Sequence, residues 1–311
     1  MERLADRLQA GEVLVADGAM GTLLIERGLP PGEAPESLNL RRPDLLEEIA
    51  RLYAEAGAQI VGANTFGGSP ARLAMHGLAG EVEAINRTGV EAARRGAGEG
   101  IYVAGSCGPS GRLLKPYGDA DPDEIYAGFL RQTGALVAAG VDAIYVETMT
   151  DLAEARLAVR AAKAASGAIP VAATMTFDRT RRGFYTVMGV DIPAAAAGLA
   201  EVGADLVGAN CGNGIEDMVL IARAFAACAE RPLLIQSNAG LPETVGGRLL
   251  YKETPEFMAA RVPELIAAGA AVIGGCCGTT PAHIRALRQA VDRTMSGRRP
   301  RAKETREGTQ A

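Results

Sequence analysis

The sequence alternates between short apolar runs and longer stretches in which apolar residues recur at helical spacing. This alternation is typical of repeated strand–helix units, whose strands form a parallel sheet. Eight runs qualify as strands, and they cover residues 13–17, 59–64, 101–106, 143–147, 170–176, 205–211, 232–238 and 271–275. Eight units in a chain of 311 residues predict an α/β protein with a (β/α)8 barrel, also called a TIM barrel. The alternative is a doubly wound open sheet, which usually has fewer strands.

Helix-capping residues mark the starts of several segments between these strands. Asp121 and Asp151 each stand where an N-cap side chain accepts a backbone hydrogen bond. Glu154, three residues after Asp151, predicts a capping box. Pro263 lies inside the helical pattern after the seventh strand, so we expect that helix to be kinked or split there.

The barrel is expected to span residues 1–295 as a single domain. Residues 296–311 are polar and charged without apolar periodicity, which predicts a disordered tail. A net charge of −5 without a basic stripe gives no support to nucleic-acid binding. The chain has no signal-peptide pattern and no apolar run of about 18 residues, so we expect a soluble cytoplasmic protein that neither spans nor binds a membrane.

Polar and sulfur-containing side chains are concentrated where the predicted strands end. In a (β/α)8 barrel the functional side chains lie at this C-terminal edge, because the loops that follow the strands meet there. The residues at these ends are Asp17, Asn64, Ser106, Glu147, Thr176, Asn210, Cys211, Asn238, Cys276 and Cys277. The opposite ends of the strands carry mostly Ala, Gly, Pro and Asp. This asymmetry predicts one functional site at the C-terminal edge.

Three of the five cysteines stand at these ends: Cys211 after the sixth strand, and Cys276 and Cys277 after the eighth. Catalytic zinc sites typically have three protein ligands and one open position, and zinc favours thiolate. The spacing alone also fits buried hydrophobic cysteines or a strained redox pair of neighbouring cysteines. The shared position at strand ends favours a zinc site. The other two, Cys107 and Cys228, are expected to be small buried side chains, with a place in the lining of the site as the alternative for Cys107.

Cys276 and Cys277 can face one ion only if the chain leaves strand geometry between them, because neighbouring strand residues point to opposite faces. The flanking glycines, Gly274, Gly275 and Gly278, are expected to permit that departure. Three thiolates would give zinc a net negative charge. Such an ion is a poor generator of hydroxide, but it suits the binding of a fourth thiol as a nucleophilic thiolate. The predicted chemistry is therefore alkyl transfer to sulfur.

Asp17 and Glu147 end the first and fourth strands and are expected to face the same opening. Two acids there suit either general acid–base catalysis or the binding of an ammonium group. With a metal deprotonating the nucleophile, the second role fits better. The turn at residues 18–22 offers successive backbone N–H groups for a carboxylate, although it also fits an ordinary strand–helix turn. An amino acid that carries a thiol would use all three features.

Together these motifs resemble the homocysteine S-methyltransferase family, and most closely the homocysteine-binding module of cobalamin-dependent methionine synthases. The motifs that carry the resemblance are Asp17–Thr22, Ala63–Phe66, Glu147-Thr148, Asn210-Cys211 and Gly274–Pro281. The resemblance runs from about Val13 to Val291. It implies a (β/α)8 barrel with zinc held by residues that match Cys211, Cys276 and Cys277.

The same resemblance implies how homocysteine is held. Its amino group would meet Asp17 and Glu147, and its carboxylate would meet the backbone amides of Ala19 and Met20. The expected function is a zinc-dependent S-methyltransferase that converts homocysteine to methionine.

Full methionine synthases continue into folate- and cobalamin-binding modules, whereas this chain ends after the first. The methyl donor is therefore expected to be a methyl-corrinoid on a partner protein. S-methylmethionine or betaine is an alternative donor. A second alternative is a thiol-binding zinc subunit that needs a corrinoid- or folate-binding partner and has no activity of its own. A Schiff-base lyase has little support, because no lysine ends a predicted strand.

Overall fold

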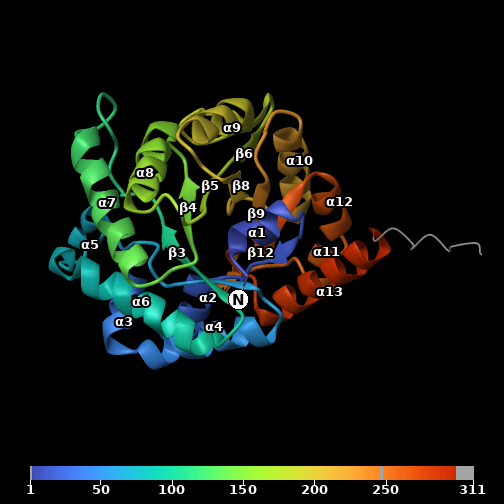
Figure 1. Ribbon diagram of the computed structural model, residues 1–311, viewed down its shortest axis with the longest axis horizontal. Helices are drawn as coiled ribbons and strands as arrows, with labels where there is room; N and C mark the ends of the chain where they lie inside the picture. Colours follow the sequence, from blue (N-terminus) through green and yellow to red (C-terminus); the bar gives the residue numbers. More distant parts are fainter. Residues whose placement is uncertain (1, 246–247, 299–311) are drawn as a thin grey trace, which may run out of the picture.

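In the computed structural model, which describes residues 2–245 and 248–298, eight parallel strands form one closed sheet (Figure 1). Their order is β1-β12-β9-β8-β5-β4-β3-β2, and a bridge between Ala16 and Ile60 closes the ring from β1 to β2. The strands are β1 (Leu14–Val15), β2 (Ile60–Gly62), β3 (Tyr102–Cys107), β4 (Ala143–Met149), β5 (Val171–Met175), β8 (Leu206–Asn210), β9 (Leu233–Ser237) and β12 (Ala270–Gly275). All eight coincide with the predicted runs, so the predicted (β/α)8 barrel is confirmed.

Helices surround the ring of strands (Figure 1). They are α1 (Leu4–Gln9), α2 (Met20–Glu26), η1 (Pro35–Ser37), α3 (Leu38–Arg41), α4 (Pro43–Glu55), α5 (Pro70–Ala74), η2 (Ala79–Glu81), α6 (Val82–Ala97), α7 (Pro122–Ala138), α8 (Leu152–Ala165), α9 (Ile192–Glu201), α10 (Ile215–Ala226), α11 (Pro255–Ala259), α12 (Val262–Ala267) and α13 (Pro281–Arg298). Two antiparallel hairpins that the sequence did not predict follow β5 and β9. They are β6 (Asp178–Thr180) with β7 (Gly183–Tyr185), and β10 (Glu243–Val245) with β11 (Arg248–Leu250). None of the described helices is long and apolar enough to cross a membrane.

The helices start where the capping residues predicted, but one predicted side-chain contact is not formed. Asp121 and Asp151 accept backbone N–H groups at the starts of α7 and α8. Pro263 stands in the first turn of α12 and separates it from α11, so the predicted split is confirmed. The predicted capping box is wrong, because Glu154 is buried and accepts the N–H of Ser110 at 2.8 Å.

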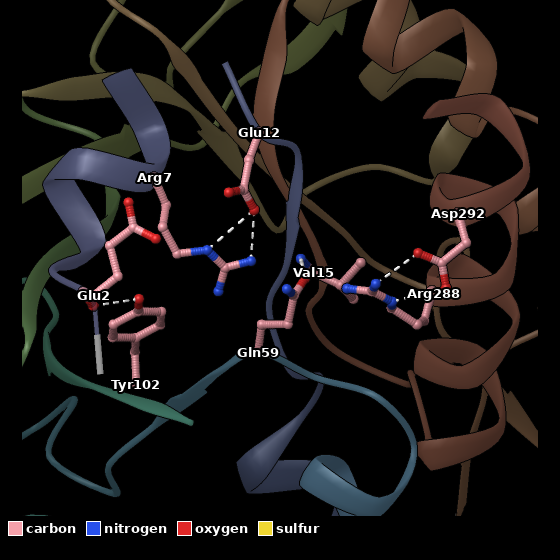
Figure 2. Close-up of polar contacts among 8 residues, drawn as sticks. All are labelled: Glu2, Arg7, Glu12, Val15, Gln59, Tyr102, Arg288 and Asp292. Carbon is pink, nitrogen blue, oxygen red and sulfur yellow. Dashed lines mark hydrogen bonds and ion pairs between the residues drawn. The ribbon is translucent and has the colours of Figure 1, made fainter. Parts of the chain in front are cut away.

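Helix α1 covers the N-terminal end of the barrel (Figures 1 and 2). Leu4 packs against apolar side chains inside the ring, and the Tyr102 hydroxyl donates to the Glu2 carbonyl at 2.7 Å. Nearby, the Val15 N–H donates to Gln59 Oε1 at 3.2 Å. This end of the barrel is therefore closed.

The barrel interior changes from apolar to polar along the strands. Leu14, Ile60, Ala143 and Leu206 belong to one buried apolar cluster inside the ring. Side chains alternate between the two faces of a strand, so the last inward positions follow two residues after this layer or later. These positions are Gly62, Ser106, Glu147, Thr174, Asn210, Gln236 and Gly274. Apolar side chains thus fill the N-terminal part of the barrel interior, and most of the polar inward-facing side chains lie at its C-terminal end.

Helix α13 continues to Arg298 and includes Ser296 and Gly297. The predicted boundary between barrel and tail, after residue 295, therefore falls inside this helix. The rest of the predicted disordered tail, residues 299–311, lies outside the described residues.

Candidate functional site

The structure brings Cys211, Cys276 and Cys277 together at the C-terminal end of the barrel. Their sulfur atoms all lie within 4.8 Å of one another, and those of Cys211 and Cys277 are 3.8 Å apart. Zinc–sulfur bonds of about 2.3 Å in a tetrahedral site place two sulfurs about 3.8 Å apart. The separation of Cys211 and Cys277 therefore matches that of two ligands of one zinc ion, and Cys276 lies close enough to complete a group that could hold a metal.

The backbone around the cysteines departs from strand geometry in an unexpected place. Cys211 has a φ of 60°, a left-handed conformation that is unusual for a residue with a side chain. Gly278 also has a positive φ, of 78°, as expected. Gly274 and Gly275 remain in β12, so the expectation that they break the strand is wrong. They provide space instead, because a Cβ on Gly275 would lie 2.3 Å from Thr279 Oγ1.

The thiols influence one another's ionisation. The pKa of Cys211 is lowered, because the thiols of Cys276 and Cys277 donate hydrogen bonds to its sulfur. The same interaction with Cys211 raises the pKa of Cys276 and Cys277. On its own the cluster thus favours a single thiolate, and a cation is needed to hold all three sulfurs deprotonated.

The remaining cysteines lie apart from the site. Cys107 is fully buried, as expected, and burial raises the pKa of its thiol. Cys228 is exposed, and its thiol donates to the Ala224 carbonyl at 3.3 Å. The expectation of a buried Cys228 is wrong, because α10 ends at Ala226 and the residue lies beyond it.

Asp17 and Glu147 share a cavity of about 310 Å³ with the three cysteines, and Glu36 is a third acid in its lining. Asp17 Oδ2 accepts the N–H of Gly62 at 2.7 Å, and burial raises the pKa of Asp17 to about 7 against the effect of that bond. Glu147 Oε1 accepts the hydroxyl of Ser106, and burial raises the pKa of Glu147 to about 7 as well. Removal from water makes the charged forms costly, so the pair favours a cationic ligand between them.

Ala19 and Met20, whose backbone amides were expected to bind a carboxylate, both border the same cavity. The N–H of Ala19 donates to Thr279 Oγ1 at 3.1 Å, so this amide is already bonded. Helix α2 begins at Met20 without a side-chain cap, and the N–H groups of its first turn have no partner within the helix. Of the two expected amides, Ala19 is therefore bonded within the protein, whereas Met20 stays a prediction.

Asn210 connects the substrate side of the cavity with the cysteines, a role that the sequence did not reveal. Its Oδ1 accepts the Thr148 N–H and the Thr174 hydroxyl, each at 2.7 Å. Its Nδ2 lies 3.5 Å from Glu147 Oε2 and 3.9 Å from Cys276 Sγ. The feature of the sequence that could have indicated this role is an amide side chain at the end of an apolar strand, directly before Cys211.

Comparisons with known proteins agree with these observations. The methionine synthase of Mycobacterium leprae is 35% identical over 318 residues, which cover 97% of this chain and 26% of the relative. The methionine synthase of Mycobacterium tuberculosis is 36% identical over 296 residues, covering 90% of this chain and 24% of the relative. The chain thus spans about a quarter of the length of these curated relatives.

Among solved structures, the metallated form of the homocysteine methyltransferase MmuM from Escherichia coli superimposes with a TM-score of 0.75 and 26% identity. The match covers 92% of this chain and 99% of that protein. The sequence model described as "Homocysteine S-methyltransferase" matches residues 14–291, which include the whole barrel and the three cysteines. The chain therefore belongs to the homocysteine S-methyltransferase family.

Proposed function

We propose that this protein is a zinc-dependent S-methyltransferase that transfers a methyl group to the thiol of homocysteine and so forms methionine. The observation that carries the proposal is one cavity whose lining includes the three cysteines together with the carboxyl groups of Asp17 and Glu147. An amino acid that carries a thiol would place its sulfur at the cysteines and its ammonium group at the carboxyl groups. The names of the methionine synthase relatives and of the homocysteine methyltransferase MmuM support the same substrate.

Cys211, Cys276 and Cys277 would hold the zinc ion. The 3.8 Å separation of Cys211 and Cys277 Sγ supports this assignment, as does the metallated form of the structural relative. A zinc ion there would lower the pKa of the substrate thiol from its ordinary value near 8.5 and keep the sulfur nucleophilic.

The chain's own residues would hold the rest of the substrate. Asp17 and Glu147 would bind the ammonium group, which offsets the unfavourable burial of their charges. Ser106 would hold the Glu147 carboxyl group by the hydrogen bond that it already makes. The N–H of Met20 would bind the substrate carboxylate at the start of α2, while Ala19 is fixed by Thr279.

The proposed donor is a methyl-corrinoid carried by a partner protein. The methionine synthase relatives extend well beyond the aligned region, which covers 24–26% of each, and this agrees with a donor that is bound outside the matched region. The same observation favours a second candidate function, a zinc-dependent thiol-binding subunit that is active only with a corrinoid- or folate-binding partner. S-methylmethionine and betaine remain as alternative donors.

Purified protein, prepared without chelator, tests the proposal when zinc is quantified and homocysteine methylation is assayed with methylcobalamin, S-methylmethionine and betaine. We expect one zinc per chain and methionine formation with methylcobalamin. Cys276→Ala should lose both zinc and activity. Activity that appears only after a corrinoid protein is added would favour the subunit function. Unchanged zinc content and methyl transfer in Cys276→Ala would refute the mechanism.

A further inference from the structure

Among the described residues other than glycine, only Thr148 and Cys211 have a positive φ, and in both it is 60°. This left-handed conformation is unfavourable for a residue with a side chain, and most of all for a β-branched one such as threonine. It persists only where the surrounding contacts hold it. Both residues line the substrate cavity: Thr148 follows Glu147 of the proposed ammonium site, and Cys211 belongs to the proposed metal site.

Strand β4 loses its regular pairing at the two positions occupied by Glu147 and Thr148. It pairs with β3 as far as Val146, and its pairing with β5 passes from Val146 directly to Met149. No residue on these neighbouring strands is paired with Glu147 or Thr148. The backbone that presents the Glu147 carboxyl group to the cavity therefore depends on other contacts.

The side chain of Asn210 supplies these contacts. Its Oδ1 accepts the Thr148 N–H at 2.7 Å, and its Nδ2 donates to Thr148 Oγ1 at 2.8 Å. The two bonds hold both the backbone and the side chain of Thr148. A third bond, from the Thr174 hydroxyl to Oδ1 at 2.7 Å, fixes the orientation of the amide. Asn210 is fully buried, which strengthens these bonds because water does not compete for them.

The backbone of Asn210 continues into the metal side of the site. Cys211 is the next residue, and its N–H donates to the Gln236 carbonyl at 3.1 Å. The Nδ2 of Asn210 also lies 3.9 Å from Cys276 Sγ. One buried residue thus joins the left-handed turn that presents Glu147 to the left-handed turn that presents a cysteine.

A rigid connection between these two turns fixes the span that a bound substrate must bridge. Homocysteine has one more methylene group than cysteine between its sulfur and the carbon that carries its ammonium group. In a site of fixed span, the shorter thiol cannot occupy the ammonium site and the metal site equally well. A difference of one methylene group typically changes binding roughly 10- to 200-fold. If the two turns could move independently, this difference should become smaller.

We propose that Asn210 is a positioning residue that fixes the span between the ammonium site at Glu147 and the metal site at Cys211, so that the cavity selects homocysteine over cysteine. The inference rests on the proposed function, in which homocysteine is the substrate. Asn210 acts here through its neighbours and not by contact with the reacting atoms. Its loss should therefore reduce the preference for homocysteine, whereas general damage to the fold should weaken the binding of both thiols alike.

Titration calorimetry of the zinc-loaded full chain with homocysteine and with cysteine tests this through the ratio of the two Kd values. In the unchanged protein we expect the Kd of cysteine to be roughly 10- to 200-fold higher. Asn210→Ala removes all three side-chain bonds and should reduce this ratio to about threefold or less. Thr174→Val removes only one of them, lies outside the cavity lining and should reduce the ratio by a smaller factor. It provides the reading if Asn210→Ala does not fold.

Asn210→Asp is the conservative variant. It keeps an oxygen that accepts the Thr148 N–H and the Thr174 hydroxyl, and the Thr148 hydroxyl can donate to its second oxygen. The two ligands carry the same charged groups, so the added negative charge should change both Kd values alike. The ratio should therefore stay close to that of the unchanged protein. A ratio as low as that of Asn210→Ala would contradict the role of these bonds.

The matched control is Asn86→Ala. Asn86 is equally buried, and its amide donates to the carbonyls of Gly68 and Val82, neither of which lines the cavity. This variant should lower the melting temperature without changing the ratio. An unchanged ratio in both Asn210→Ala and Thr174→Val, or an equal change in Asn86→Ala, would overturn the role of Asn210 while leaving homocysteine as the substrate. Failure of the unchanged protein to bind homocysteine would overturn the proposed function and this inference together.

Discussion

Thr279 is hydrogen-bonded to Ala19, 260 residues away in the sequence: its Oγ1 accepts the Ala19 N–H at 3.1 Å. The same hydroxyl donates to the Cys276 carbonyl at 2.7 Å. One side chain thus connects the turn before α2, on the substrate side, with the loop that carries two cysteines. The distance between the proposed sulfur and carboxylate sites depends on this connection.

Thr279→Val removes both hydrogen bonds with little change in shape. The buried Ala19 N–H and Cys276 carbonyl lose a partner, so we expect a loss of about 1–3 kcal/mol in the free energy of unfolding. The KM for homocysteine should rise as well. Thr294→Val is the control, because its hydroxyl bonds only to the Ala290 carbonyl within α13. Equal stability of the two variants in urea would argue against the connection.

Gly275→Ala should damage the same contact by crowding. A Cβ there would lie 2.3 Å from Thr279 Oγ1, so either β12 or the cysteine loop must shift. We expect a loss of more than about 2 kcal/mol and a lower zinc content. Gly134→Ala, within α7 and without any atom within 4 Å of the added Cβ, should instead gain about 0.5–1 kcal/mol. Full zinc occupancy in Gly275→Ala would contradict this account.

Asp17 should make the metal-free protein less stable as the pH rises. Its pKa is about 7 in the folded protein, above the ordinary value of 3.8, so the folded state binds the proton more tightly. The stabilisation is complete below the ordinary value and is lost as the pH rises through about 7. Between pH 3.8 and about 7, the free energy of unfolding should therefore fall less steeply with pH in Asp17→Asn than in the unchanged protein.

The control for Asp17→Asn is Asp119→Asn, since Asp119 is exposed and its pKa is lowered by a hydrogen bond from Arg112. This substitution should leave the slope between pH 4 and 7 unchanged, to within about 0.3 kcal/mol per pH unit. Urea unfolding at several pH values measures both slopes. Identical slopes for Asp17→Asn and the unchanged protein would show that Asp17 does not titrate as described.

Glu147→Gln should weaken homocysteine binding without removing the metal. The substitution keeps the shape and a hydrogen-bond acceptor for Ser106, but it removes one of the two charges that face the ammonium group. We expect a roughly 10- to 100-fold rise in the homocysteine Kd with zinc content unchanged. Glu243→Gln, on the β10–β11 hairpin, is a control with an exposed acid and should change neither quantity. A loss of zinc in Glu147→Gln would assign this residue to the metal site.

Periodicity and capping residues were sufficient to predict the framework of this protein. All eight strands follow apolar runs, and Pro263 separates α11 from α12, because these features depend on residues that are local in the sequence. The gathering of Cys211, Cys276 and Cys277 follows from the same framework. Parallel strands in a closed barrel bring their C-terminal ends to one edge.

Tertiary contacts account for the failures. Glu154 bonds to Ser110 rather than to its own helix, and Ala19 bonds to Thr279 rather than to a ligand. Both partners are distant in the sequence, so no local pattern reveals them. The left-handed φ of Cys211 was not predicted either, because a local pattern assigns that conformation to Gly212, which also has a positive φ, rather than to a residue with a side chain.

X-ray absorption at the zinc edge, measured with and without homocysteine, tests the central claim most directly. The account predicts one zinc per chain with three sulfur ligands at about 2.3 Å from the cysteines. A fourth sulfur should join them when homocysteine is added and should not appear in Cys276→Ala. Fewer than three sulfur ligands in the unchanged protein, or a ligand set that homocysteine does not alter, would contradict it.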